Sequence, residues 1–325
     1  SAWGQVAAPA AAASAAASGE MGIGEWLTRM HDASRQRTYI GTFVVSAGAS
    51  MSSAKIWHVC TGDLQMERVE SLSGQPRSTF RRNDQVVTFL PSSRVAVAET
   101  RESLGLFPDL LRATDASLGQ YYSVRRHGVE RVAGLDADVV QLQPKDKLRF
   151  GYRIWSEKET GMVIKLQTLD VDGRVLEQAA FSEIQMNAPV SVAKLTQMME
   201  NTDGYRVDKP EMLKTSAAAE GWAMKNPVPG FKPMGCHKRP SPAADGHSPG
   251  GAMQWVFSDG LASVSIFVEA FDPRRHVQEG STALGATQTL TQRLKEKSGD
   301  WWLTVIGEVP HSTLTAFALG LERTR

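Results

Sequence analysis

Residues 149–184 read RFGYRIWSEKETGMVIKLQTLDVDGRVLEQAAFSEI, and they carry the strongest strand and turn signals in the chain. Apolar and polar residues alternate along it in three segments: 149–156, 162–170 and 174–184. Such alternation is typical of half-buried β-strands. The last two segments are separated by Asp172-Gly173, a preferred two-residue hairpin turn because glycine adopts positive φ at little cost. The stretch therefore predicts an antiparallel meander.

On its N-terminal side, the strand pattern continues back to a single helix. Residues 21–36 place apolar side chains at the spacing of an amphipathic helix: Ile23, Trp26, Leu27 and Met30. Segments rich in β-branched and aromatic residues then predict strands at 38–46, 54–60, 65–72, 85–90 and 139–142. The apolar stretch 104–111, LGLFPDLL, is interrupted by Pro108 and predicts a short helix or an apolar loop.

On its C-terminal side, the sequence divides the chain into two domains. Strand patterning stops after residue 187, so we place a linker at 196–215, between a domain of residues 21–195 and a domain of residues 216–325. The second domain is predicted to end in a helix that begins at Pro310, after strands at 253–258, 261–270, 283–293 and 301–306. Residues 1–18 are Ala-rich and uncharged, which predicts a disordered leader over 1–20, either a mature N-terminus or a cloning remnant.

Composition and motifs argue against several functions. The 36 Lys and Arg residues balance 35 Asp and Glu residues, so the basic excess expected of a nucleic-acid-binding protein is absent. No apolar run reaches the roughly 18–20 residues of a membrane span. The sequence contains no G-x-S-x-G, H-E-x-x-H, P-loop or G-x-G-x-x-G motif, and its 7 histidines are scattered. We therefore predict a protein without catalytic activity, cofactor or metal.

The two cysteines, Cys60 and Cys236, allow three interpretations. A disulfide between them would close a long loop and contribute on the order of 5 kcal/mol in the chain-entropy model. With His58 and His237 they offer two thiols and two imidazoles, a ligand set for zinc, although the adjacent Cys-His pair is awkward for tetrahedral geometry. The third interpretation is two unrelated, partly buried thiols. The disulfide is favoured if the protein is exported.

Two further groups of residues are candidates for ligand binding. Arg81 and Arg82 form either an anion-binding patch, for example for a lipid phosphate, or a solvated strand end. An apolar set lines either a lipid pocket or the core, and pattern alone favours the core; its members are Trp57, Phe89, Leu106, Phe107, Leu110 and Leu111.

Seven stretches, taken in order, carry a resemblance to a known family. They are YIGTFVV (39–45), ERVESL (67–72), RRND (81–84), YRIW (152–155), LDVDGRVLE (169–177), FSDGLASV (257–264) and TVIGEVP (304–310). Together they resemble the RseB/MucB family, periplasmic negative regulators of the sigma-E envelope-stress response. The resemblance runs from about residue 20 to residue 322.

The resemblance implies a fold and a function. The fold is α+β, with an N-terminal curved antiparallel half-barrel wrapped on helices, like LolA and LppX, and a smaller α/β C-terminal domain. The function is periplasmic: the family binds the periplasmic part of a membrane anti-sigma factor of the RseA or MucA type and shields it from proteolysis. Lipid or lipopolysaccharide fragments release the complex. Periplasmic residence also favours the disulfide, and a half-barrel makes the apolar set a stronger candidate for a lipid lining.

Alternatives to this function stay open at the sequence level. One is a periplasmic lipid or lipoprotein carrier, which would hand its ligand on rather than lose a protein partner. Another is an enzyme whose titratable side chains converge in one cleft. The sequence also leaves open whether the chain forms a homodimer.

Overall fold

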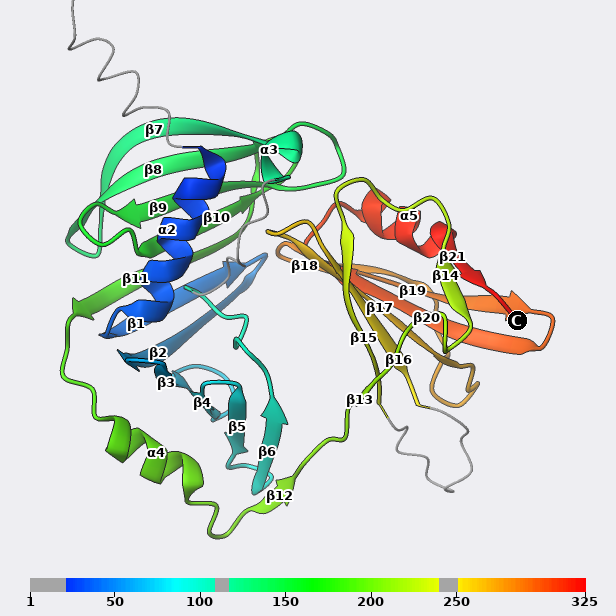
Figure 1. The fold of residues 1–325 in the computed structure, drawn as a ribbon, viewed down its shortest axis with the longest axis horizontal. Helices are drawn as coiled ribbons and strands as arrows, with labels where there is room; N and C mark the ends of the chain where they lie inside the picture. Colours follow the sequence, from blue (N-terminus) through cyan, green and yellow to red (C-terminus); the bar gives the residue numbers. More distant parts are fainter. Residues whose placement is uncertain (1–21, 109–116, 240–250) are drawn as a thin grey trace, which may run out of the picture.

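The computed structural model describes residues 22–108, 117–239 and 251–325. Two mainly antiparallel sheets dominate this part of the chain, a twelve-stranded sheet followed by a seven-stranded one, with a two-stranded ribbon beside the second. The two sheets lie side by side and are formed by successive parts of the chain (Figure 1). The predicted fold class, a curved antiparallel sheet on helices plus a smaller C-terminal domain, is confirmed.

The first sheet has the order β12-β6-β5-β4-β3-β2-β1-β11-β10-β9-β8-β7. Its strands are β1 (Tyr39–Ala47), β2 (Ser50–Thr61), β3 (Leu64–Ser71), β4 (Ser78–Arg82), β5 (Gln85–Leu90), β6 (Val95–Thr100), β7 (Tyr122–Val132), β8 (Leu135–Pro144), β9 (Gly151–Glu157), β10 (Val163–Leu169), β11 (Val175–Met186) and β12 (Arg206–Asp208). The meander predicted at 149–184 forms β9, β10 and β11. Strand β11 then pairs with β1, which joins the two halves of the sheet.

The sheet curves around helix α2 (Ile23–Gln36) (Figure 1). The helix buries Trp26, Leu27 and Met30, the residues whose spacing predicted it. They join the largest core cluster with side chains from both halves of the sheet, including Phe43 and Phe181. Each fully buried side chain of this size contributes about 1.5–3 kcal/mol. We call the sheet surface against α2 the concave face.

The opposite, convex face of the sheet carries helix α4 (Val192–Glu200). Ser191 caps this helix by accepting a hydrogen bond from the backbone N–H of Lys194. The helix buries Leu195 and Met199 against β3 and β4 in a separate cluster. Period-two alternation explains the two clusters, because Ile56 points into the concave core while its neighbour Trp57 lies against the convex one.

The segment predicted as a linker, 196–215, is not without structure. It contains the end of α4 and strand β12, which pairs in parallel with β6 and extends the first sheet to Asp208. It also contains β13 (Leu213–Lys214), the edge strand of the second sheet. Parallel pairing between distant segments leaves no local sequence signal, which is why the pattern alone did not predict β12.

The second sheet has the order β13-β15-β16-β17-β20-β19-β18. Its remaining strands are β15 (Lys232–Lys238), β16 (Met253–Ser258), β17 (Ser263–Ala270), β18 (Gly280–Leu284), β19 (Thr287–Glu296) and β20 (Gly299–Gly307). The sheet packs against helix α5 (His311–Gly320), which follows Pro310 as predicted and buries Leu314, Phe317 and Ala318. Strands β14 (Trp222–Met224) and β21 (Leu321–Arg323) form the ribbon.

One strand prediction in the second domain is wrong. The segment 283–293 is not a single strand, because the chain turns between Leu284 and Thr287 and forms the hairpin of β18 and β19. Gly285 has a φ of +60° at this turn, a conformation that glycine adopts without strain. The turn lacks the Asn-Gly or Asp-Gly pair that makes such hairpins recognisable from sequence.

Candidate binding site on the concave face and at the domain junction

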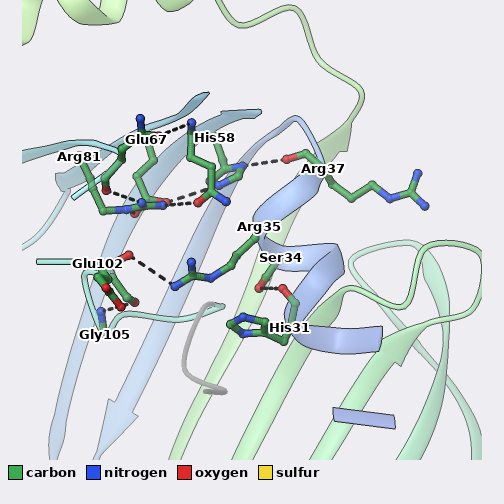
Figure 2. Close-up of polar contacts among 12 residues, drawn as sticks. His31, Ser34, Arg35, Arg37, His58, Glu67, Arg81, Glu102 and Gly105 are labelled. Carbon is green, nitrogen blue, oxygen red and sulfur yellow. Dashed lines mark hydrogen bonds and ion pairs between the residues drawn. The ribbon is translucent and has the colours of Figure 1, made fainter. Parts of the chain in front are cut away.

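A row of polar side chains crosses the concave face near the C-terminal end of α2, and Figure 2 labels three of its members, His58, Glu67 and Arg81. Register pairs Tyr39 with His58, His58 with Glu67, and Glu67 with Arg81, so the four side chains stand side by side on strands β1 to β4. The guanidinium of Arg81 lies 2.7 Å from the Glu67 carboxylate, and Nε2 of His58 lies 3.7 Å from it. The ring of Tyr39 stacks on that of His58.

This row is sealed from solvent. Arg81 is 2 % exposed, Glu67 4 % and His58 1 %. Arg81 also donates hydrogen bonds to the carbonyl of Asn83 and to the side chain of Gln65. Because its charge and donors are already matched, Arg81 is not available to a surface anion.

The predicted anion-binding pair is therefore divided between the two faces of the sheet. Arg81 and Arg82 are neighbours on β4, so they point to opposite faces. Arg82 is exposed and lines an open hollow of 740 Å³ beside α4 on the convex side. The structure does not bring the two arginines together as one patch.

The predicted lipid-lining residues are also distributed over several places. Phe107 is 3 % exposed and packs between Phe43 and Phe181 in the concave core. Phe89 and Trp57 belong to the convex cluster, where Arg68 stacks on Trp57. Leu106 is 43 % exposed, and Leu110 and Leu111 lie outside the described residues. Of the six residues, Phe107 is the one that the described part of the chain places in the concave core. Trp57 and Phe89 occupy strand positions whose side chains point to the convex face.

Cys60 and Cys236 are free thiols in the structure, so the predicted disulfide is absent from it. They lie on different sheets, Cys60 near the end of β2 and Cys236 in β15. Burial raises the pKa of the Cys236 thiol to about 11. Among the described residues, no three His, Cys, Asp or Glu side chains form a group that could hold a metal ion.

A buried ion pair joins the two domains. Arg149, in the segment before β9, lies 3.2 Å from the carboxylate of Asp259 in the turn between β16 and β17, and both side chains are fully buried. The hydroxyl of Tyr122 donates to the same carboxylate at 2.5 Å. Thr313 of α5 adds a hydrogen bond to the carbonyl of Leu148 at 2.8 Å. The domains therefore meet through largely buried polar contacts.

Beside this ion pair, a cavity of about 60 Å³ lies between the concave face and the second domain. Its floor is one row of the sheet, since Tyr152 pairs with Thr168 and Thr168 with Glu177. The second domain covers it with Leu261 and Glu308. No spacing in the sequence links these residues, and only the fold brings positions 152, 177 and 308 together.

The pKa values of two glutamates that line this cavity are raised. Burial, and then the neighbouring Glu177 carboxylate, raise the pKa of Glu308 to about 7. Burial also raises the pKa of Glu177, and a hydrogen bond from the backbone of Ala286 partly opposes that rise. The hydroxyl of Tyr152 is buried and has no hydrogen-bond partner in the structure.

These features define a class of protein: a two-domain binding protein built on a curved antiparallel sheet, whose internal faces are packed and whose domains meet at a polar junction. No described helix is long and apolar enough to cross a membrane. Family models described as the MucB/RseB N-terminal domain and the MucB/RseB C-terminal domain match residues 23–199 and 216–322. The chain belongs to the MucB/RseB family.

Curated relatives and solved structures agree with this assignment. The chain is 29% identical over 300 residues to the sigma factor AlgU regulatory protein MucB of Pseudomonas aeruginosa, with 92% of this chain and 90% of the relative covered. It is 23% identical to the sigma-E factor regulatory protein RseB of Escherichia coli K12, covering 95% and 93%. A solved complex of Pseudomonas aeruginosa MucA and MucB contains a chain that is 27% identical, with a TM-score of 0.72 and coverage of 93% and 99%. These relatives carry the names of regulators.

Proposed function

We propose that this protein is a periplasmic negative regulator that binds the periplasmic part of a membrane anti-sigma factor and shields it from proteolysis. One observation carries the proposal: over 93% of its length the chain shares the fold of MucB in a complex with MucA. A second structure is described as MucB in complex with MucA(peri), with a TM-score of 0.70. A protein that shares both domains with MucB offers a partner the same two-domain platform.

The domain junction supports binding across both domains. The Arg149–Asp259 ion pair fixes one sheet relative to the other, so a partner meets a preorganised surface. The hairpin tips also meet, because a Cβ on Gly285 would lie 2.7 Å from Cβ of Ala47. Large apolar side chains flank this contact in exposed positions, with Met51 73 % and Leu284 58 % exposed.

Release by lipid or lipopolysaccharide fragments is the second part of the proposal. A ligand releases a partner only if it binds the partner-free arrangement more tightly than the bound one. The concave face is filled by α2 and Phe107, so an acyl chain must displace part of this packing to enter. Phe107 lies in a segment, residues 101–108, that contains no described strand or helix, so its displacement leaves the described strand pairing intact. Lipid binding would therefore be coupled to a rearrangement.

A pull-down tests this function. The full chain is immobilised, the periplasmic segment of the anti-sigma factor from the same genome is the prey, and lipopolysaccharide fragments are added in a parallel sample. We expect retention of the segment without the fragments and its loss with them. Absence of retention in both samples would contradict the regulator function.

The same experiment separates the regulator from a lipid or lipoprotein carrier. A carrier extracts ligand from membranes and delivers it to an acceptor, whether or not the anti-sigma factor is present. Retention of the segment together with no transfer of labelled lipid between vesicles supports the regulator. Transfer without retention supports the carrier.

A further inference from the structure

The cavity at the domain junction has an electrostatic imbalance that the neighbouring ion pair does not remove. The charge of Arg149 is already matched by Asp259 and by Asp146, whose carboxylate lies 3.3 Å from its Nε. Glu177 and Glu308, in contrast, have no cationic side chain within 4.0 Å among the described residues. When both are ionised, two carboxylates face one small space without a counter-charge. Such a space attracts a cation.

The floor of the cavity supplies an independent sign of a ligand. Tyr152 is 6 % exposed, lines the cavity, and its hydroxyl has no hydrogen-bond partner. A buried hydroxyl without a partner costs about 1–3 kcal/mol. The neighbouring position in the row is Thr168, which also lines the cavity. A hydrogen-bond donor in the cavity would satisfy the phenol oxygen and the carboxylates together.

Size and lining restrict the chemistry of the ligand. A volume of 60 Å³ compares with roughly 10–15 Å³ for one water, so the cavity accepts a head group of about four heavy atoms. Leu166, Ala179 and Leu261 form an apolar part of its wall, which suits an aliphatic stem. Phosphate and carboxylate ligands are excluded by repulsion from the two acids. A divalent ion finds only two carboxylates here, fewer than the usual set of oxygen ligands.

We propose that this cavity is a binding site for one cationic group on an aliphatic stem, an alkylammonium or alkylguanidinium. The head group donates to Glu177, Glu308 and the Tyr152 hydroxyl, and the stem lies along Leu261. The group has two sources, a free amine or a Lys or Arg side chain of a polypeptide. Because floor and cover belong to different domains, occupancy stabilises the domain arrangement seen in the structure. This proposal does not depend on the regulator function, since it concerns the protein alone.

The test is an NMR titration of the full chain with n-butylammonium chloride, observing the ¹³C-labelled carboxyl groups of Glu side chains. Glu308 and Glu177 are assigned with Glu308→Gln and Glu177→Gln. We expect a saturable shift of both carboxyls that sodium chloride at equal ionic strength does not produce. Because the Glu308 pKa is about 7, the affinity should rise about tenfold from pH 6 to pH 8.

Variants separate binding from structure. Tyr152→Phe should weaken n-butylammonium binding by roughly two- to tenfold without lowering the melting temperature, since it removes only an unpartnered hydroxyl. Glu183→Gln, at an exposed position of β11, is the matched control for Glu177→Gln on the same strand and should leave the affinity unchanged. A Tyr152→Phe variant that melts earlier and binds normally would assign the hydroxyl a structural role and contradict the site.

A comparison of two peptides identifies the source of the cationic group. Binding of a capped Gly-Lys-Gly peptide, but not of its norleucine analogue, assigns the site to a Lys side chain. Binding of n-butylammonium, but not of the lysine peptide, assigns it to a free amine. Calcium chloride binding more tightly than n-butylammonium would overturn the assignment. A Glu177 carboxyl shift of wild-type size on adding n-butylammonium to the Glu308→Gln variant would also overturn it. These outcomes do not involve the anti-sigma factor, so they stay distinguishable from failure of the regulator function.

Discussion

The substitution Asp259→Asn tests the domain junction most sharply. Oδ1 of Asp259 accepts hydrogen bonds from the backbone N–H groups of Leu261 and Ala262 at 2.8 and 2.7 Å, and asparagine keeps this acceptor. It removes the charge that faces Arg149, whose side chain is fully buried, and replaces the oxygen that accepts from Arg149 and the Tyr122 hydroxyl with a donating amide nitrogen. A buried cation that loses its partner destabilises a protein by about 3–5 kcal/mol. Since Asp146 still lies 3.3 Å from Arg149, we expect the lower end, about 3 kcal/mol.

Urea unfolding followed by tryptophan fluorescence measures this loss. The double variant Arg149→Met with Asp259→Leu should recover much of it, because replacing a buried ion pair with apolar side chains is often neutral or stabilising. The matched control is Asp172→Asn, which breaks the exposed pair with Arg174 and should leave the unfolding curve unchanged. A loss below about 1 kcal/mol for Asp259→Asn, or a double variant no more stable than the single one, would show that the Arg149–Asp259 pair does not hold the junction together.

Three other predictions concern single groups. Glu67→Gln leaves Arg81 buried without a counter-charge and should lower the free energy of unfolding by about 3 kcal/mol, whereas Arg82→Gln on the opposite face should not change it; urea unfolding compares the two. Glu308 binds its proton more tightly in the folded state, where its pKa is about 7 against 4.5 in the unfolded chain. The contribution of this group to the free energy of unfolding is therefore complete below pH 4.5 and falls by on the order of 3 kcal/mol as the pH rises to 7. Thermal melting should show this fall in the wild type and not in Glu308→Gln. A colorimetric disulfide reagent, used without reductant, should detect two free thiols in the denatured chain. In the native chain, Cys60 should react faster than the buried Cys236. A denatured chain with no free thiol would contradict this prediction.

Local patterns were enough to predict most of the elements. The meander of β9 to β11 follows from alternation and from the Asp172-Gly173 turn, and α2 and α5 follow from apolar residues at helical spacing. These signals are local, so the sequence carries them without knowledge of the fold. The hairpin between β18 and β19 was missed because Gly285 alone is a weak turn signal.

The candidate sites were harder to predict because they depend on which face a strand residue occupies and on contacts between distant segments. The Arg81-Arg82 pair reads as a surface patch, yet neighbours on a strand point to opposite faces, and one of them is sealed beside Glu67. The predicted apolar set likewise combined residues that point to opposite faces of the sheet, with Trp57 on the convex face. Tyr152 and Glu308 come together only through the pairing of the domains, and no spacing in the sequence encodes that.

The most direct test of the regulator function is a fluorescence-anisotropy titration of the full chain into the labelled periplasmic segment of the anti-sigma factor from the same genome. We expect a saturable rise in anisotropy that lipopolysaccharide fragments reverse. The Asp259→Asn variant, which loosens the junction between the two domains, should bind the segment more weakly. A flat titration, with the segment intact and the chain folded, would contradict the claim that this protein binds an anti-sigma factor.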